Sequence, residues 1–308
     1  MTARTARVLC LGSLVLDTIA VVDSMPGDDV RVEAEHVVLA GGGNASTAAV
    51  AMAWLGVDVD FAGLVGDDEV GRIVVAELAA EGVGVDHVQV RGDVETTHSV
   101  VVVNSARGTR TILTRPAAVP DSIPSGYEWL HVDKIGYRAL LAAGGDGARV
   151  SIDDGNPVPD LDLSIIDLYV PTVQVLLERY ATRDPLRAAQ QARQDGARTV
   201  VATDGSRGSF AVDDHDLAYA PALPIVPRSS LGAGDVFHGA LLAAIVLGKR
   251  LPEAIRFANV TAALSCRAID GRSGIPGRAE VEDVLRELPT TPGDPAVLIR
   301  DLIGASAA

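Results

Sequence analysis

Cysteine and aromatic residues are scarce in this sequence of 308 residues, and each scarcity limits what the protein can be. The two cysteines, Cys10 and Cys266, lie far apart in the chain, and Cys10 falls in an apolar run. Both are predicted to be buried, reduced thiols, which favours a cytoplasmic location. Aromatic residues make up 4% of the chain although 48% of it is hydrophobic, so Ala, Val, Leu and Gly must supply most of a large core.

Basic residues are outnumbered as well. The chain has 26 Lys and Arg against 41 Asp and Glu, a formal net charge of -15, and it has no dense basic run. Such a charge disfavours nonspecific attraction to nucleic acid or to an anionic membrane. No stretch reaches the roughly 20 apolar residues of a membrane span, and Gly12, Ser13 and Asp17 interrupt the apolar N-terminal run in a way that argues against a secretory signal. We therefore predict a small-molecule partner, with neither nucleic acid nor a membrane.

Short apolar runs alternate with helical stretches along most of the chain. The runs are rich in Val and Leu and end at Gly, Asp or Pro, as buried strands do. Several helical stretches end at the glycine expected just past a helix. This alternation predicts an α/β fold with a doubly wound, mostly parallel sheet flanked by helices. The predicted strands are 7–12, 57–66, 129–133, 149–153, 167–171 and 198–205, and the predicted helices include 46–56, 70–82, 184–196 and 233–249.

Two segments, 15–40 and 96–115, break this rhythm because apolar and polar residues alternate in them. The second is predicted to be a hairpin that turns near residues 106–108. We expect both to form a small β-sheet lid that closes over a site; the alternative is that they extend the edge of the main sheet. The apolar run SVVVV offers a face to cover, which predicts a homodimer that pairs through the lid strands. The core, with the nucleotide and catalytic site, then comprises residues 1–14, 41–95 and 116–308.

The strongest chemical signal is the run SSLGAGDVFHGALLAAI at 229–245. Gly232, Ala233 and Gly234 can present backbone N–H groups at the start of a helix, where unsatisfied donors and the helix dipole stabilise an anion. Asp235 in the same turn is kept ionised there and can accept a proton from a hydroxyl that attacks a bound phosphate. The run therefore predicts phosphoryl transfer to an alcohol, with Asp235 as the catalytic base. The alternative is that Asp235 only caps the helix.

This run resembles the C-terminal signature of the ribokinase-like (PfkB) carbohydrate kinases. AGGGNASTAAVAMAWLG at 40–56 is similar to the N-terminal signature of that family, and GSLVLD at 12–17 to its opening strand. N-terminal and hairpin segments most resemble ketohexokinases, whereas C-terminal segments most resemble bacterial sulfofructose kinases. The resemblance covers essentially the whole chain and implies ATP-dependent phosphorylation of a sugar hydroxyl. Other segments in the family's order are GLVGDDEVG, VATDGSRGS, RFANVTAALSC and GRSGIP.

On the substrate side, the resemblance implies that Asp17 binds sugar hydroxyls through its two carboxylate oxygens. Gly42 and Gly43 would let the backbone approach the sugar. Asn44 would hydrogen-bond the substrate, although an asparagine there could equally cap the following helix. Thr47 replaces a second asparagine of the signature, and its shorter reach alters the predicted contact.

The lid hairpin carries two further residues, Asn104 and Arg110, which match positions that face sugar and phosphate in ketohexokinases. An arginine supplies a planar fork of donors for phosphate oxygens. Surface hairpins also carry such residues for solubility alone, and this alternative stays open. The six histidines show no metal-binding spacing and are interpreted as ordinary surface or core residues, of which His98 alone, on the lid, could touch substrate. No metal-ligating side chain is predicted.

On the nucleotide side, Thr203, Gly205 and Gly208 match a loop that lies along ATP after a sheet strand. Asn259 matches a helix position near the adenine. The alternatives are a plain turn for the loop and a surface amide for Asn259.

At two places the sequence departs from the family pattern, and these departures affect how metal ions are expected to bind. Thr172 and Val175 stand where many members have an Asn and a Glu associated with magnesium, so Mg²⁺ is expected to be held mainly by ATP phosphates and water. Ser229 and Ser230 replace an Asp-Thr pair, which makes a monovalent-cation site doubtful. The acidic pair at 153–154 is interpreted as a turn at a strand end.

Three other functions compete with sugar phosphorylation. A nucleoside kinase of the same family would want aromatic stacking partners in the lid, and the lid segments have none. A catalytically silent sugar or nucleotide sensor would not need to keep Asp235. A dinucleotide-dependent oxidoreductase is disfavoured because no GxGxxG follows the first predicted strand.

Overall fold

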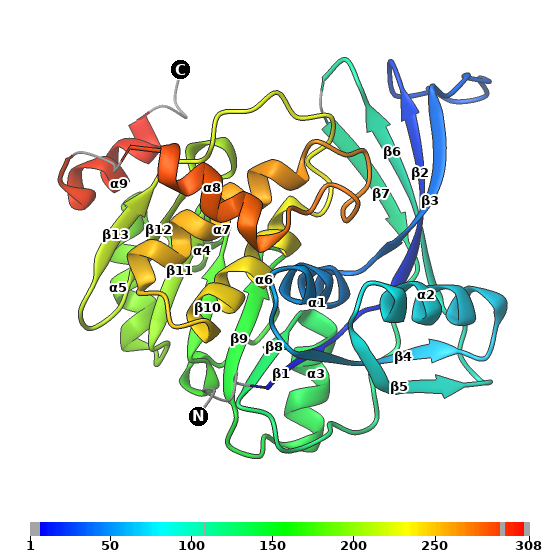
Figure 1. Cartoon of the computed structure of the whole chain (residues 1–308), viewed down its shortest axis with the longest axis horizontal. Coiled ribbons are helices and arrows are strands. Elements are labelled where there is room, and N and C mark those ends of the chain that lie inside the picture. The colour runs from blue at the N-terminus through cyan, green and yellow to red at the C-terminus, as the bar shows by residue number, and fades with distance from the viewer. Residues whose placement is uncertain (1–6, 108, 290–292, 305–308) are drawn as a thin grey trace.

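A computed structural model describes residues 7–107, 109–289 and 293–304, and within these residues the chain forms two β-sheets (Figure 1). The larger has nine strands in the order β13-β12-β11-β10-β9-β8-β1-β4-β5, and the smaller has four in the order β3-β2-β6-β7. The six predicted core strands are present, while β5, β12 and β13 are additional. The strands of the larger sheet are β1 (Val8–Leu11), β4 (Val59–Gly66), β5 (Gly84–Arg91), β8 (Trp129–Val132), β9 (Arg149–Asp154), β10 (Leu168–Pro171), β11 (Thr199–Thr203), β12 (Ser209–Val212) and β13 (Leu217–Ala220).

The larger sheet is parallel from β11 to β5, and only β12 and β13 at one edge run antiparallel. Its central strands β1, β8 and β10 are buried along their whole length because helices cover both faces. In β1, for example, Val8 and Cys10 pack in one core cluster while Leu9 and Leu11 pack in the other. The predicted doubly wound fold is therefore confirmed. Cys10 is buried and free, as is Cys266.

The helices divide between the two faces of this sheet (Figure 1). Residues of α1, α2, α6, α7 and α8 join the core cluster on one face, and residues of α3, α4, α5 and α9 join the cluster on the other. The helices are α1 (Asn44–Trp54), α2 (Glu69–Ala80), α3 (Lys134–Ala143), α4 (Val173–Arg179), α5 (Pro185–Gln194), α6 (Ala233–Val246), α7 (Leu251–Ser265), α8 (Arg278–Glu287) and α9 (Pro295–Gly304).

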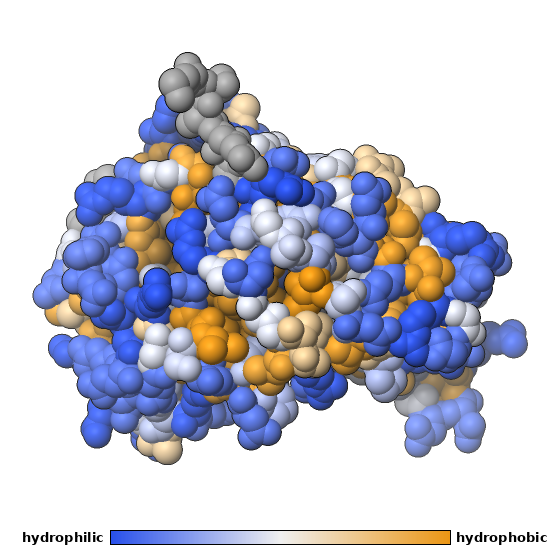
Figure 2. All heavy atoms as spheres, turned by 90° about the horizontal axis from the view of Figure 1, so that it is seen from below, coloured by the Kyte–Doolittle hydropathy of each residue, from blue (hydrophilic) through white to orange (hydrophobic). Residues whose placement is uncertain are grey.

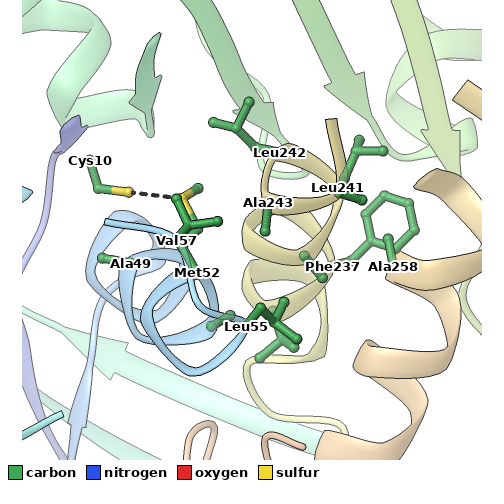
Figure 3. Close-up of a cluster of buried hydrophobic side chains, with 14 of the residues drawn as sticks. Cys10, Ala49, Met52, Leu55, Val57, Phe237, Leu241, Leu242, Ala243 and Ala258 are labelled. Atoms are coloured by element: carbon green, nitrogen blue, oxygen red, sulfur yellow. Dashed lines mark hydrogen bonds between the residues drawn. The ribbon is translucent and has the colours of Figure 1, made fainter. Parts of the chain in front are cut away.

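Helices α1 and α6 pack closely against each other, and Figure 3 shows the apolar side chains that fill the space around them. The approach depends on small residues. A Cβ atom added to Gly239 of α6 would overlap the carbonyl oxygen of Ala48 and lie 2.9 Å from the Cβ of Ala51 in α1. Because both helices begin at the same end of this contact, their first residues are held close together.

The smaller sheet is built from β2 (Val15–Val22), β3 (His36–Gly42), β6 (Thr97–Asn104) and β7 (Thr109–Thr114). The central strands β2 and β6 are parallel, and each has an antiparallel outer neighbour. The two predicted segments thus form a sheet of their own, rather than an edge of the main sheet. Its inner face packs Ile19 and Val101 in a cluster that includes Leu231 and Ile269 of the core.

Seen from below in Figure 2, the surface is mostly hydrophilic, with hydrophobic residues gathered in smaller groups. Among the described residues, none of the helices combines the length and the apolar character needed to cross a bilayer.

Candidate active site

Helix α6 begins with a glycine-dependent turn. Gly232 is the N-cap and has a φ of 73°, in the left-handed region that favours glycine. A side chain here would also place a Cβ 2.7 Å from the Cα of Gly271. The N–H of Ala233 donates to the carbonyl of Ser230 at 3.3 Å, whereas Gly234 is exposed with open space where a Cβ would stand. The turn leaves room for an anion at the positive end of the helix.

Asp235 lies in this first turn and is partly exposed. Its Oδ1 accepts a hydrogen bond of 2.7 Å from Nδ2 of Asn44, the first residue of α1. Burial of the carboxyl and the negative charge of Asp153 raise the pKa of Asp235 to about 7, although the nearby charge of His238 lowers it. A carboxyl group that titrates near neutral pH suits a general base, because it can both take up and release a proton.

The substrate-side glycines are required by close contacts. A Cβ on Gly42 would overlap the carboxylate of Asp17 on the neighbouring strand β2, and a Cβ on Gly43 would overlap the carbonyl of Ser13. Gly43 also has a φ of 100° and is the N-cap of α1. Burial raises the pKa of Asp17, while a hydrogen bond from Ser99 lowers it. The structure thus brings Asp17, both glycines, Asn44 and Asp235 to one place.

Thr47 is buried and contacts an arginine that the sequence did not single out. Its Oγ1 accepts a hydrogen bond of 3.2 Å from Nε of Arg272, whose Nη2 also donates to the carbonyl of Gly42 and to Oγ of Ser46, each at 2.9 Å. Arg272 is itself only 3% exposed. It belongs to the GRSGIP segment, so the motif was noticed but the role of its arginine was missed. Through these hydrogen bonds the arginine connects the loop before α8 to the start of α1.

The two lid residues lie on opposite faces of the small sheet. Arg110 pairs with Val103 on the inner face, and its Nη1 donates to Oγ of Ser230 at 3.1 Å, next to the turn that begins α6. Asn104 follows Val103 and therefore points to the other face. It is buried, and its Oδ1 accepts from the N–H of Arg107 in the hairpin turn. The structure brings Arg110 toward the site and does not bring Asn104 there.

A cavity of about 560 Å³ opens where β9, β10 and β11 end. Ligands bind at the carboxyl ends of strands in open α/β sheets, and the volume is typical of a small-molecule site. The predicted Thr203 and Gly205 line it, together with Thr172, Ser206 and Glu178. Among the described residues there is no group of three or more His, Cys, Asp or Glu side chains arranged for a metal ion.

The other two predicted nucleotide residues support the edge of the sheet. Gly208 has a φ of 103°, and a Cβ there would overlap the carbonyl of Ala220. Asn259 is buried rather than on a helix surface; its Nδ2 donates to the same carbonyl at 2.8 Å and its Oδ1 accepts from Oγ of Ser209. Both residues thereby fix β12 and β13 beside the cavity.

Three buried polar residues near Asp235 were not predicted as site residues. Asp153 does lie at a strand-end turn, where its Oδ1 accepts the N–H of Gly155 at 2.8 Å, but it is 6% exposed and also accepts from Asn44 at 3.1 Å, which the turn interpretation did not foresee. His238 is no ordinary histidine, since its Nε2 lies 3.0 Å from Oδ1 of Asp153. Asp133 accepts from the N–H and Oγ of Ser13 and holds the loop before β2. One sequence signal could have identified the two aspartates: both lie at the carboxyl ends of predicted parallel strands, which meet at one edge of the sheet.

Comparisons with known proteins agree with this arrangement. The family model described as pfkB family carbohydrate kinase matches residues 5–160 and 176–278. Ketohexokinase from Mus musculus is 27% identical, over 87% of this chain and 98% of that protein, and ribokinase from Bacillus subtilis is 26% identical, over 91% and 99%. The structure of Arabidopsis thaliana ribokinase complexed with ribose and ATP is similar in fold, with a TM-score of 0.80 at 22% identity over 92% and 99% of the two chains. With well over half of its length matched, the chain belongs to the pfkB family of carbohydrate kinases.

Proposed function

We propose that this protein transfers the γ-phosphoryl group of ATP to a hydroxyl, most simply a primary alcohol, of a sugar or sugar-like molecule. The observation that carries the proposal is Asp235, a carboxylate in the first turn of α6 beside the glycine-rich start of that helix. Relatives named ketohexokinase and ribokinase, and a ribokinase bound to ribose and ATP, support the same reaction class.

The described geometry accounts for each part of such a transfer. The acceptor hydroxyl would donate its proton to the Asp235 carboxylate as its oxygen attacks the phosphorus atom. Backbone N–H groups of the turn from Gly232 to Gly234 would stabilise charge on the transferred group. Asp17 and the backbone at Gly42 and Gly43 would hold the sugar beside it. Contacts to the other hydroxyls of the sugar would then determine which hydroxyl lies next to Asp235 and reacts.

ATP would occupy the cavity at the ends of β9 to β11, with Thr203 and Gly205 along it. The polar lining and the volume fit a nucleotide. Mg²⁺ would neutralise phosphate charge while held mainly by the phosphates and water, since Thr172 and Val175, which line the cavity, stand where many family members have an Asn and a Glu associated with magnesium. No monovalent cation is invoked.

The small sheet, residues 15–40 and 96–115, would act as a lid over the remaining core. Its inner face carries Asp17 and Arg110 toward the turn that begins α6. Closure would exclude water and so protect ATP from hydrolysis.

The outer face of the lid would bind a second copy of this chain. Val37, Leu39, Val100 and Leu113 are 44% to 65% exposed there, and they belong to three different strands whose register places them on one face. An apolar face of this kind on a thin sheet needs to be covered. A two-fold symmetric dimer would cover it with the same surface.

The test is ATP consumption by the purified protein over a panel of ketoses, aldoses, sugar acids and nucleosides. Turnover with one or more sugars or sugar acids is expected. Turnover with nucleosides alone would replace the proposal with a nucleoside kinase. ATP binding without turnover on any member of the panel would overturn it in favour of a sensor.

A further inference from the structure

Two buried residues below the proposed base have no part in the reaction so far. Asp153 is the next-to-last residue of β9 and is 6% exposed, and His238 lies in α6 one turn after Asp235 and is 5% exposed. Nε2 of His238 lies 3.0 Å from Oδ1 of Asp153, which also accepts the N–H of Gly155 at 2.8 Å. Buried ionisable side chains are costly unless they are paired. A buried pair so close to a base invites a role in its chemistry.

Asn44 connects this pair to the base. Its Nδ2 donates to Oδ2 of Asp153 at 3.1 Å and to Oδ1 of Asp235 at 2.7 Å. A side-chain amide nitrogen has two hydrogens, so both are used. The two carboxylates also determine which end of the amide faces them, because an amide oxygen would be repelled. A continuous path of contacts thus runs from His238 through Asp153 and Asn44 to Asp235.

The charges along this path depend on one another. Although burial alone raises the pKa of Asp153, the charge of His238 and its hydrogen bond hold that pKa below its ordinary value. Burial likewise lowers the pKa of His238, but Asp153 and Asp235 raise it above its ordinary value. Burial and the charge of His238 lower the pKa of the neighbouring His131 to about 3, so His238 is the histidine that carries the proton. With this proton on His238, the 3.0 Å contact between its Nε2 and Oδ1 of Asp153 is an ion pair.

Other charged groups also face these residues. Asp133, the residue after β8, also raises the pKa of Asp235, but less than burial and Asp153 do. Asp154 adds to the negative charge around His238, and the charge of Arg272 interacts with Asp235 from the loop before α8. Asp133 and Arg272 are common to every variant discussed below, and Asp154 is not among the groups that shift the pKa of Asp235 itself.

We propose that the Asp153–His238 ion pair is a positioning unit for the phosphoryl transfer, which orients the Asn44 amide toward the Asp235 carboxylate and sets the charge around that base. The inference rests on the proposed function. It also changes the expected contact of Asn44 with substrate, because its only remaining hydrogen-bonding atom is the acceptor Oδ1.

Asp154 provides a matched control for Asp153. It is the next residue of β9, is 1% exposed and lies on the opposite face of the strand. Its oxygens accept from the N–H of Val158 at 2.6 Å and from the hydroxyl of Tyr169 at 2.8 Å. Asp153→Asn and Asp154→Asn therefore remove one buried carboxylate each from neighbouring positions, and only the first lies on the path to Asp235.

The experiment is the pH dependence of kcat/KM for the wild type and both variants, with the best substrate of the panel. The wild type should lose activity as the pH falls through about 7, because Asp235 then becomes protonated. Asp153→Asn should move this acid limb to lower pH by roughly half a unit or more, since a like charge beside the base is gone while Asp235 itself still favours the charged form of His238. Its kcat should fall roughly tenfold because Asn44 is less well oriented. Asp154→Asn should leave the limb in place.

An acid limb that stays in place in an active Asp153→Asn, or one that moves equally in both variants, would overturn this inference and leave the proposed function standing. No turnover by the wild type would overturn both. A second measurement covers the case of a variant that does not fold: NMR titration of the histidine rings in the wild type, with His238→Gln for assignment. His238 should keep its proton above the ordinary range of a histidine. Titration of His238 at or below that range would contradict the ion pair.

Discussion

The two halves of the site differ in how firmly they are held before any ligand binds. In the core half, Asn44, Asp153, Asp235 and His238 are joined by contacts of 2.7 to 3.1 Å on packed helices and a central strand. In the lid half, every residue of β7 is exposed, and Arg110 reaches the core through one hydrogen bond of 3.1 Å. The proposed base is therefore preorganised by the core, whereas the proposed lid would gain its order from substrate.

The largest effect is expected in the core half. Asp235→Asn keeps the shape of the side chain and an oxygen that can accept from Asn44, but loses the proton-accepting charge. We expect kcat to fall by roughly 10² to 10⁴, with ATP affinity changed far less. Steady-state kinetics and calorimetric ATP binding measure the two effects. A helix-capping role predicts little change, because Asn caps about as well as Asp, so a variant with more than about a tenth of wild-type turnover contradicts the base assignment.

The rigidity of the core half can be broken through the α1–α6 contact. Gly239→Ala would drive a Cβ into the carbonyl of Ala48, so we expect the free energy of unfolding to fall by about 1 to 3 kcal/mol and kcat to fall because the starts of the helices move apart. Gly145→Ala is the control, since its Cβ would meet only Leu140 at an ordinary 3.7 Å. Equal urea denaturation midpoints for the two variants would show that the close packing of these helices is dispensable.

Hydrogen exchange can test whether the lid half of the site gains more order than the core half when ligands bind. Addition of substrate and a nonhydrolysable ATP analogue should slow exchange in residues 15–40 and 96–115, because the lid closes over the ligands. The first turns of α1 and α6 should change less, since they are already packed. Mass spectrometry of peptides from each region measures both. Exchange that is unchanged in both lid segments would rule out the lid.

The smallest expected change is a factor of two in mass. Light scattering at micromolar concentration should give a dimer of the 31.9 kDa chain. Leu39→Lys, on the outer face of the lid, should give a monomer because it places a charge in the interface. Ile73→Lys is a matched control, since Ile73 is also an exposed apolar residue but lies on α2. A monomeric wild type would count against the dimer.

Local patterns in the sequence were enough for the fold class and for one end of the site. Alternating apolar runs and helices predict a doubly wound sheet because period and burial are local properties of a segment. The glycine-rich start of α6 can likewise be predicted from sequence, because the left-handed glycine and the aspartate in the first turn of the helix are only three residues apart. The edge strand β5 was missed, since the mixed polarity of GVDHVQVR resembles that of a loop.

Only the tertiary structure decided which distant residues meet. Asn44 and Asp235 are 191 positions apart, and Thr47 and Arg272 are 225 apart, so no local pattern connects them. The burial of Asp153 was missed because the same two acids fit a strand-end turn either at the surface or in the interior, and burial depends on what packs against them. Asn104 lies one residue from the inner face of the lid, and in a strand one residue reverses the side. Composition and motifs thus determined the kind of chemistry, while packing and register determined the residues that would perform it.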